Sequence, residues 1–248
     1  MRRYQLYLIN EKELAPHTVK VRMSALRFLY WKALKRRDLL FDDLPMPKAP
    51  KKLPVVLSRE EVTRLIEAAS SLRHRTILIV LYATGIRRAE LTRLKIGDID
   101  SQRMVIHIRK GKGQRDREIP MTPKLLQALR DYWRWERSKV YLFPCPNGVE
   151  EAPISSKTVY HACREAAVRS GLTKKIGPHT LRHSFATELL DSGADLRTIQ
   201  HLLGHADLKN TLVYLHLSQR HVRAATNPLD QITLNHYGLK PLSENDPS

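Results

Sequence analysis

The sequence predicts a mainly α-helical protein with one small antiparallel β-hairpin, in which a short N-terminal helical segment precedes a larger domain. Three observations predict this. Apolar residues recur at helical spacing along most of the chain. Residues 103–120 instead combine an apolar run, a turn containing glycines and a return run, which is typical of a hairpin. Four prolines within residues 44–58 exclude a helix there and indicate a linker.

The charge balance indicates a polyanionic partner. The 248 residues include 43 lysines and arginines against 25 acidic residues, a net charge of +18. Because this excess is spread along the whole chain, we expect nucleic acid. A cationic surface kept for solubility, an acidic protein partner and a membrane surface are the alternatives.

The cysteine content and the length of the apolar runs indicate the cellular compartment of the protein. The two cysteines, Cys145 and Cys163, exclude a disulfide framework and have no metal-ligand spacing. The longest wholly apolar run, residues 77–83, is too short to span a bilayer, and residues 1–15 contain no signal-peptide core. We therefore expect a cytoplasmic, nucleoid-associated protein without membrane contact.

The N-terminal segment, residues 1–53 with the linker, is expected to contact the DNA backbone through one basic amphipathic helix over residues 17–37. The candidate phosphate contacts are five cations of this helix: Lys20, Arg22, Arg27, Lys32 and Lys35. A solvated face on a small bundle would show the same pattern, and both interpretations can hold together.

The second domain is expected over residues 54–232, followed by a tail over residues 233–248. Ser58 and Glu61 form a capping box, which predicts a helix start. Further apolar patterns predict the remaining helices, at 58–70, 73–83, 84–94, 122–138, 155–170, 179–192, 195–203 and 207–214, with a last one from 218.

The stretch "GPHTLRHSFATELL", residues 177–190, opens a core helix with basic groups. Leu181, Phe185 and Leu189 supply its apolar face. His179 and Arg182, three positions apart, lie on the same side of the first turn. A helix N-terminus of this kind favours an anion, because its free backbone amides point outward.

Six polar residues could together act on one phosphodiester: Arg87, Lys112, His179, Arg182, His205 and Tyr214. Taken singly, each has an ordinary structural explanation. Together, arginine forks match phosphate oxygens, lysine and histidine transfer protons, and a tyrosine hydroxyl is a nucleophile. Such a site needs no metal, because cationic side chains supply the charge.

The order and context of these residues resemble the tyrosine recombinases, the phage-integrase and Xer-type site-specific recombinases. Four stretches carry the resemblance, and they cover the chain from about residue 54 to 220: "YATGIRRAEL" (82–91), "RKGKGQRDREIP" (109–120), "GPHTLRHSFATELL" (177–190) and "IQHLLGHADLKNTLVYLHL" (199–217). The resemblance implies a double-stranded DNA target and two successive transesterifications through a 3′-phosphotyrosine. It implies neither a metal nor a nucleotide cofactor.

The resemblance also implies the role of each residue. Tyr214 matches the nucleophile, and His179 the histidine that helps take its proton. Lys112, with Lys110 as its nearest competitor, matches the general acid toward the 5′-oxygen.

Arg87 and Arg182 match the two arginines that clamp the phosphate, and His205 a hydrogen-bond donor to it. Glu90 falls at a supporting acidic position. We expect His183 to be structural and to lie outside this set.

Residues 218–232 can form the C-terminal helix that such proteins dock onto a neighbouring protomer, which implies a homo-tetramer, although packing on its own domain is equally compatible. The N-terminal segment is about half the usual size. Three alternatives remain: a type IB topoisomerase, a non-catalytic DNA-binding protein, and a metal nuclease using the pair His179 and His183.

Overall fold

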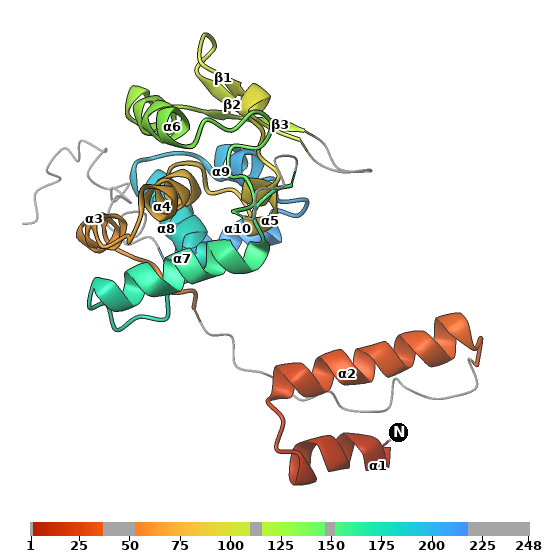
Figure 1. Cartoon of the computed structure of the whole chain (residues 1–248). Helices are drawn as coiled ribbons and strands as arrows, with labels where there is room; N and C mark the ends of the chain where they lie inside the picture. Colours follow the sequence, from red (N-terminus) through yellow and green to blue (C-terminus); the bar gives the residue numbers. More distant parts are fainter. Residues whose placement is uncertain (1, 37–52, 110–115, 147–151, 218–248) are drawn as a thin grey trace, which may run out of the picture. The chain divides into compact units, whose positions relative to one another are not determined.

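The computed structural model describes residues 2–36, 53–109, 116–146 and 152–217, and Figure 1 draws the remaining residues as a grey trace. Internal contacts divide the chain into two units, Met1–Lys52 and Leu53–Ser248. Within the described ranges, no helix is long and apolar enough to cross a membrane.

The described part of the first unit is a pair of helices. Helix α1 (Arg2–Leu6) continues as a π-helical turn, η1 (Tyr7–Glu11), and α2 (Pro16–Phe28) continues as a second one, η2 (Leu29–Ala33). The helix predicted over 17–37 is therefore confirmed, but it ends at residue 33. The two helices pack through a small core, formed by Leu8, Val19 and Met23.

The second unit is mainly helical, as predicted (Figure 1). Its central helix is α4 (Leu72–Thr84), which packs against α6, α7 and α8. The other helices are α3 (Arg59–Glu67), α5 (Arg88–Thr92), η3 (Ile96–Asp98), α6 (Pro123–Glu136), α7 (Ser156–Arg169), α8 (Pro178–Asp191), α9 (Leu196–Leu203), α10 (Lys209–Leu212) and η4 (Val213–His216). The helix predicted from residue 218 lies outside the described residues.

A small antiparallel sheet stands beside the helices. Its order is β1 (Ile99–Asp100), β2 (Val105–Ile108) and β3 (Arg117–Pro120). The predicted hairpin is confirmed as β2 and β3, which pair residue 106 with residue 119. The sequence analysis missed β1, because two residues are too few to show an alternating pattern.

Local sequence signals account for the helix ends near the site. The predicted capping box is confirmed: the Ser58 hydroxyl accepts from the Glu61 amide, and the Glu61 carboxylate accepts from the Ser58 amide. Helix α9 begins after Asp195, whose carboxylate caps two amides. Gly85 and Gly204, both left-handed, end α4 and α9 and turn the chain toward Arg87 and His205.

The described residues of the second unit form two apolar clusters. The larger one surrounds α4 and reaches the sheet. The smaller one lies under α8, α9 and η4, and its buried members are Ala186, Leu190, Ile199, Leu203 and Tyr214. The candidate nucleophile is therefore also a core residue of the smaller cluster.

Changing Gly85 to alanine should destabilise the fold for two reasons. Its φ of +60° disfavours a side chain, and a Cβ atom would collide with the Phe185 ring. Gly171 is the matched control, because it has a φ of +67° and nothing within 4 Å of a Cβ. We expect Gly171→Ala to lower the free energy of unfolding by about 1 kcal/mol and Gly85→Ala by about 3 kcal/mol. Urea unfolding measures both, and equal losses would contradict the collision.

Candidate active site

Five segments meet at the candidate site: the turn between α4 and α5, strand β3, the first turns of α8, the end of α9, and η4. They bring together six of the polar side chains that the structure describes, namely Arg87, Glu90, Arg117, Arg182, His205 and Tyr214, with His183 against the tyrosine. Lys112 and Lys110 lie outside the described residues.

Tyr214 is buried, with 1% of its surface exposed. Its hydroxyl lies 3.1 Å from Nδ1 of His183, and its ring is nearly parallel to that of His205, with centroids 6.5 Å apart. Burial raises the pKa of the phenol, while the charges of Arg182 and Arg87 act to lower it. The phenol is therefore neutral at rest and close to cations that would stabilise its oxyanion.

The expectation that His183 lies outside the set was wrong, because its ring makes the hydrogen bond to Tyr214. Its pKa falls to about 4 through burial and the neighbouring charges of His179 and Arg182. It is consequently uncharged at neutral pH and can accept a proton at Nδ1. The available signal was its spacing of four from His179, which places both rings on one face of α8.

His179 is the exposed member of that pair. Its ring centroid lies 6.4 Å from that of His183, one turn nearer the start of α8. Loss of hydration and the charges of Arg182, Arg88 and Arg87 lower its pKa. His179 is thus placed beside the histidine that touches Tyr214.

Arg182 is a buried cation, with 4% of its surface exposed. Its guanidinium donates to the carbonyl oxygens of Gly85, at 2.6 Å, and Leu203, at 2.7 Å. Within the described ranges it forms no ion pair. Burial, followed by the charge of Arg87, lowers its pKa to about 10. A nearby phosphate would compensate this charge.

Arg87 and Glu90 form a pair at the start of α5. The Arg87 guanidinium donates to Glu90 Oε1 at 3.1 Å and to the carbonyl of Gly204 at 2.9 Å. The Arg87 backbone amide donates to Glu90 Oε2 at 2.8 Å. Glu90 therefore holds both the backbone and the side chain of Arg87.

The sequence analysis missed Arg117. This residue starts β3, points inward, and donates to both oxygens of Glu90, at 3.0 and 2.8 Å, and to the carbonyl of Leu202 at 2.7 Å. Burial alone would raise the pKa of Glu90, but the hydrogen bonds and charge of Arg117, with help from Arg87, lower it to about 2. The signal was a charged residue at an inward position of a strand.

His205 follows directly after the left-handed Gly204. Its Nδ1 lies 2.9 Å from the buried hydroxyl of Thr211, which orients the ring. Burial, and then the charges of Arg182 and Arg87, lower its pKa to about 4. Its Nε2 has no partner among the described contacts, so this nitrogen can serve a bound ligand.

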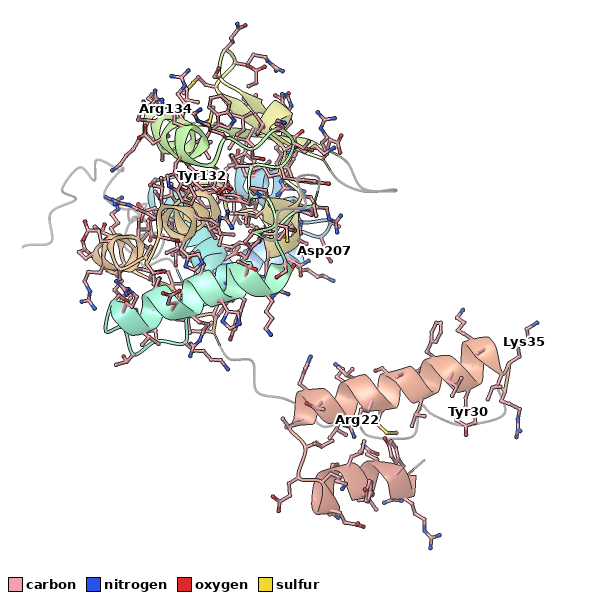
Figure 2. All side chains as sticks on the ribbon, viewed as in Figure 1. Arg22, Tyr30, Lys35, Tyr132, Arg134 and Asp207 are labelled. Carbon is pink, nitrogen blue, oxygen red and sulfur yellow. The ribbon has the colours of Figure 1, made fainter. Side chains whose placement is uncertain are left out.

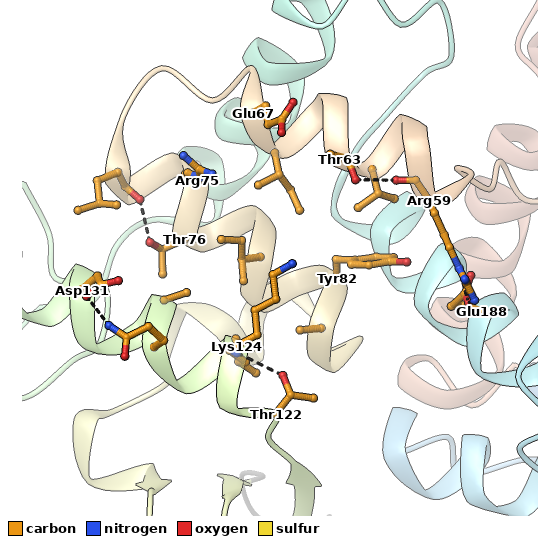
Figure 3. Close-up of a pocket in the computed structure, with 18 residues that line it drawn as sticks. Arg59, Thr63, Glu67, Arg75, Thr76, Tyr82, Thr122, Lys124, Asp131 and Glu188 are labelled. Atoms are coloured by element: carbon orange, nitrogen blue, oxygen red, sulfur yellow. Dashed lines mark hydrogen bonds and ion pairs between the residues drawn. The ribbon is translucent and has the colours of Figure 1, made fainter.

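A separate cavity lies away from these residues. It is a pocket of about 910 Å³ between α3, α4 and α6, and no residue of the candidate site lines it (Figure 3). Arg59 and Glu188, which form an ion pair, lie at one end of the view. A DNA phosphate needs a group of cations rather than an apolar cavity, so we assign the chemistry to the arginine cluster.

Comparison with known proteins decides the family. The profile described as "Phage integrase family" matches residues 55–221. The chain belongs to this family. The prediction of a Xer-like tyrosine recombinase is confirmed.

Relatives of this integrase-family chain match most of its length. A putative integrase/recombinase, y4qK, of Sinorhizobium fredii is 46% identical over 230 residues, covering 93% of this chain and 74% of the relative. Tyrosine recombinase XerA of Pyrococcus furiosus is 41% identical over 182 residues, covering 72% of this chain and 63% of the relative.

Two solved structures confirm the fold. The crystal structure of XerA recombinase aligns at a TM-score of 0.63 and 37% identity, covering 90% of this chain and 79% of that one. XerH recombinase bound to its difH substrate aligns at a TM-score of 0.69 and 26% identity, covering 88% of this chain and 67% of that one.

The two buried histidines make stability pH-dependent. Folding depresses the pKa of His183 and His205 from 6.5 to about 4, so below pH 6.5 the unfolded chain binds more protons. The free energy of unfolding should therefore decrease as the pH falls from 6.5 toward 4. Protonation of carboxyl groups adds to this loss of stability near pH 4. In the variant His183→Asn/His205→Asn, the free energy of unfolding should change less with pH than in the unchanged chain. Urea unfolding down to about pH 5 measures this dependence. An unchanged slope would contradict the depressed values.

Proposed function

We propose that this chain is a site-specific DNA recombinase that cleaves and rejoins strands through a 3′-phosphotyrosine linkage at Tyr214. One observation carries the proposal: the Tyr214 hydroxyl bonds to an uncharged histidine beside two guanidinium groups, Arg182 and Arg87. A proton acceptor, a nucleophile and cations for the phosphate are therefore within one site.

Cleavage needs one bond formed and one broken. The Tyr214 oxygen attacks phosphorus, the bond to the 5′-oxygen breaks, and the phenolic proton passes to Nδ1 of His183, with His179 one turn away. Arg87 and Arg182 stabilise the charge that develops on the phosphate oxygens, and Nε2 of His205 donates to one of them.

The family resemblance supports Lys112 as the acid that protonates the 5′-oxygen. In the second step a 5′-hydroxyl from a partner strand attacks the phosphotyrosine. This restores the phosphodiester and releases Tyr214, so bond energy is conserved and no nucleotide cofactor is needed.

Double-stranded DNA is the partner that this chemistry requires. The XerH structure is a pre-cleavage complex with difH DNA, and another captures XerH after cleavage of a palindromic difH substrate. A topoisomerase would rejoin the same strand, and a binding protein would form no adduct. Recombinant strands that join two different duplexes separate our proposal from both.

The first experiment identifies a substrate and tests the nucleophile. The chain is incubated, with EDTA, with nicked duplexes that carry a randomised segment, and DNA that stays attached under denaturing conditions is recovered and sequenced. A nick just beyond the attacked phosphate lets the short 5′-hydroxyl fragment diffuse away, which traps the adduct. We refer to the recovered sequence as the captured duplex.

We expect Tyr214→Phe to form no adduct with the captured duplex while it still binds that duplex in a gel-shift assay. The matched control is Tyr132→Phe, because Tyr132 is also fully buried and its hydroxyl bonds to Glu136 at 2.9 Å. The control should cleave like the unchanged chain. An adduct formed by Tyr214→Phe, or cleavage that requires a divalent metal, would contradict the proposal.

Two finer parts of the proposal concern assembly. Residues 218–232 join four protomers on two duplexes, and residues 1–53 bind the DNA backbone. Of the five candidate cations, Lys20, Arg22, Lys32 and Lys35 are exposed, as Figure 2 shows for Arg22 and Lys35. Arg27 is half-buried and stacks over Trp31 at 4.1 Å. Exposed cations spaced along one helix, as Lys20, Arg22 and Lys32 are, are suited to phosphate contacts, and Lys35 lies just beyond the end of this helix.

One sedimentation experiment with the captured duplex tests both parts. Deleting residues 218–248 should abolish the complex of four protomers but keep binding to single duplexes. Changing the five cations to glutamine should instead lower the slope of log affinity against log salt by about 4.5, because each phosphate contact contributes about 0.9. A tetramer without the tail, or an unchanged salt slope, would contradict the corresponding part.

A further inference from the structure

The end of α9 is held by three arginines on three consecutive carbonyl groups. Arg117 donates to the carbonyl of Leu202, Arg182 to that of Leu203 and Arg87 to that of Gly204. The last carbonyls of a helix lack partners within the helix and carry partial negative charge. This turn therefore anchors all three guanidinium groups immediately before His205.

Arg117 differs from Arg87 in its access to DNA. The Arg117 side chain is 2% exposed, whereas that of Arg87 is 37% exposed. The charge of Arg117 is paired with the Glu90 carboxylate, whereas Arg182, which is also buried, has only carbonyl partners among the described contacts, so we assign the phosphate contact to Arg182 and not to Arg117. Any effect of Arg117 on cleavage must pass through its two partners, Glu90 and the carbonyl of Leu202.

Glu90 and Leu202, the two partners of Arg117, are each linked to a residue of the proposed reaction, Arg87 or His205. Glu90 shares its oxygens between Arg117 and the guanidinium and amide of Arg87. Leu202 lies three residues before His205, whose amide closes the end of α9 by donating to Gln200. A displacement of Arg117 would therefore move both Arg87 and His205.

We infer that Arg117 is a positioning residue for strand cleavage: it fixes Arg87 through Glu90 and fixes His205 through the end of α9. The inference rests on the proposed function. The inference goes beyond the proposed function because Arg117 touches no reacting atom and acts only through its contacts with other residues. A buried ion pair is weak support for stability, since desolvation offsets its attraction, so a positional role better accounts for this cluster.

The test compares Arg117→Met with a matched pair elsewhere in the chain. Arg73 also makes a two-pronged contact with a carboxylate, that of Glu136, with side chains 16% and 15% exposed. Arg73→Met should cost similar stability but lies in α4, away from the site. Cleavage rates on the captured duplex are measured at saturating protein, and thermal unfolding and gel shift check that each variant folds and binds.

We expect Arg117→Met to slow cleavage about 100-fold, because a small displacement of catalytic groups has an effect of this size. The affinity for the duplex should change little. Arg73→Met should cleave within about twofold of the unchanged chain. In the Arg87→Ala background, adding Arg117→Met should slow cleavage by much less than about 100-fold, because the part of its effect that passes through Arg87 is already lost and only the part through His205 remains. Arg117→Lys keeps the charge but loses the fork, and should recover little of the rate.

The inference is overturned if Arg117→Met cleaves like the Arg73 control, or if the double variant shows two independent losses. If Arg117→Met does not fold, Arg117→Lys carries the same comparison, and a rate equal to the unchanged chain overturns it. If both Arg117 variants form the adduct at the rate of the unchanged chain, only this inference is contradicted. An unchanged chain that forms no adduct contradicts the proposed function, and this inference with it.

Discussion

The candidate site depends on the way the last turn of α9 satisfies its carbonyl groups. Backbone amides reach the carbonyls of Gln200 and His201, and arginines reach the next three. A helix end inside a protein must find donors for these oxygens, because a buried carbonyl without one is costly. Here the donors come from β3, α8 and the start of α5, so one helix terminus brings three distant segments together.

The same arrangement leaves the site positively charged. Two guanidinium groups, those of Arg87 and Arg117, bond to the single carboxylate of Glu90, and the third, that of Arg182, has carbonyl partners instead. Carbonyl dipoles direct a guanidinium without neutralising it, so its charge remains available to an anion. In the proposed mechanism, this preorganised charge would favour a pentavalent phosphorus centre over the bound ground state. The depressed pKa values of His183 and His205 follow from the same charges and from burial.

Much of this could be predicted from the sequence, for definable reasons. Helical periodicity and caps such as Ser58 are local signals, so the helices and the hairpin were recognised. Arg87, Arg182, His205 and Tyr214 were selected because they are polar residues in apolar contexts whose order resembles that of the tyrosine recombinases, and the structure brings these four together.

What the sequence could not reveal was which side chains touch. Arg117 is one arginine in a basic hairpin, and only the pairing of β2 with β3 and the approach of α9 show that it points inward. His183 was set aside because the family resemblance gives the proton-accepting role to His179, and only the packing of η4 shows which ring lies against Tyr214. Lys112 remains a prediction, since it lies outside the described residues.

Tyr214 belongs to the small apolar cluster under α8 and α9 as well as to the chemistry. The residue that would carry DNA is thus one whose ring fills the interior beside Leu203 and Ala186. Evolution can alter it only under two simultaneous demands, reactivity and shape. A lineage that loses catalysis would still keep an aromatic ring at position 214. Phenylalanine is the replacement that preserves the packing of the interior while removing the nucleophilic hydroxyl.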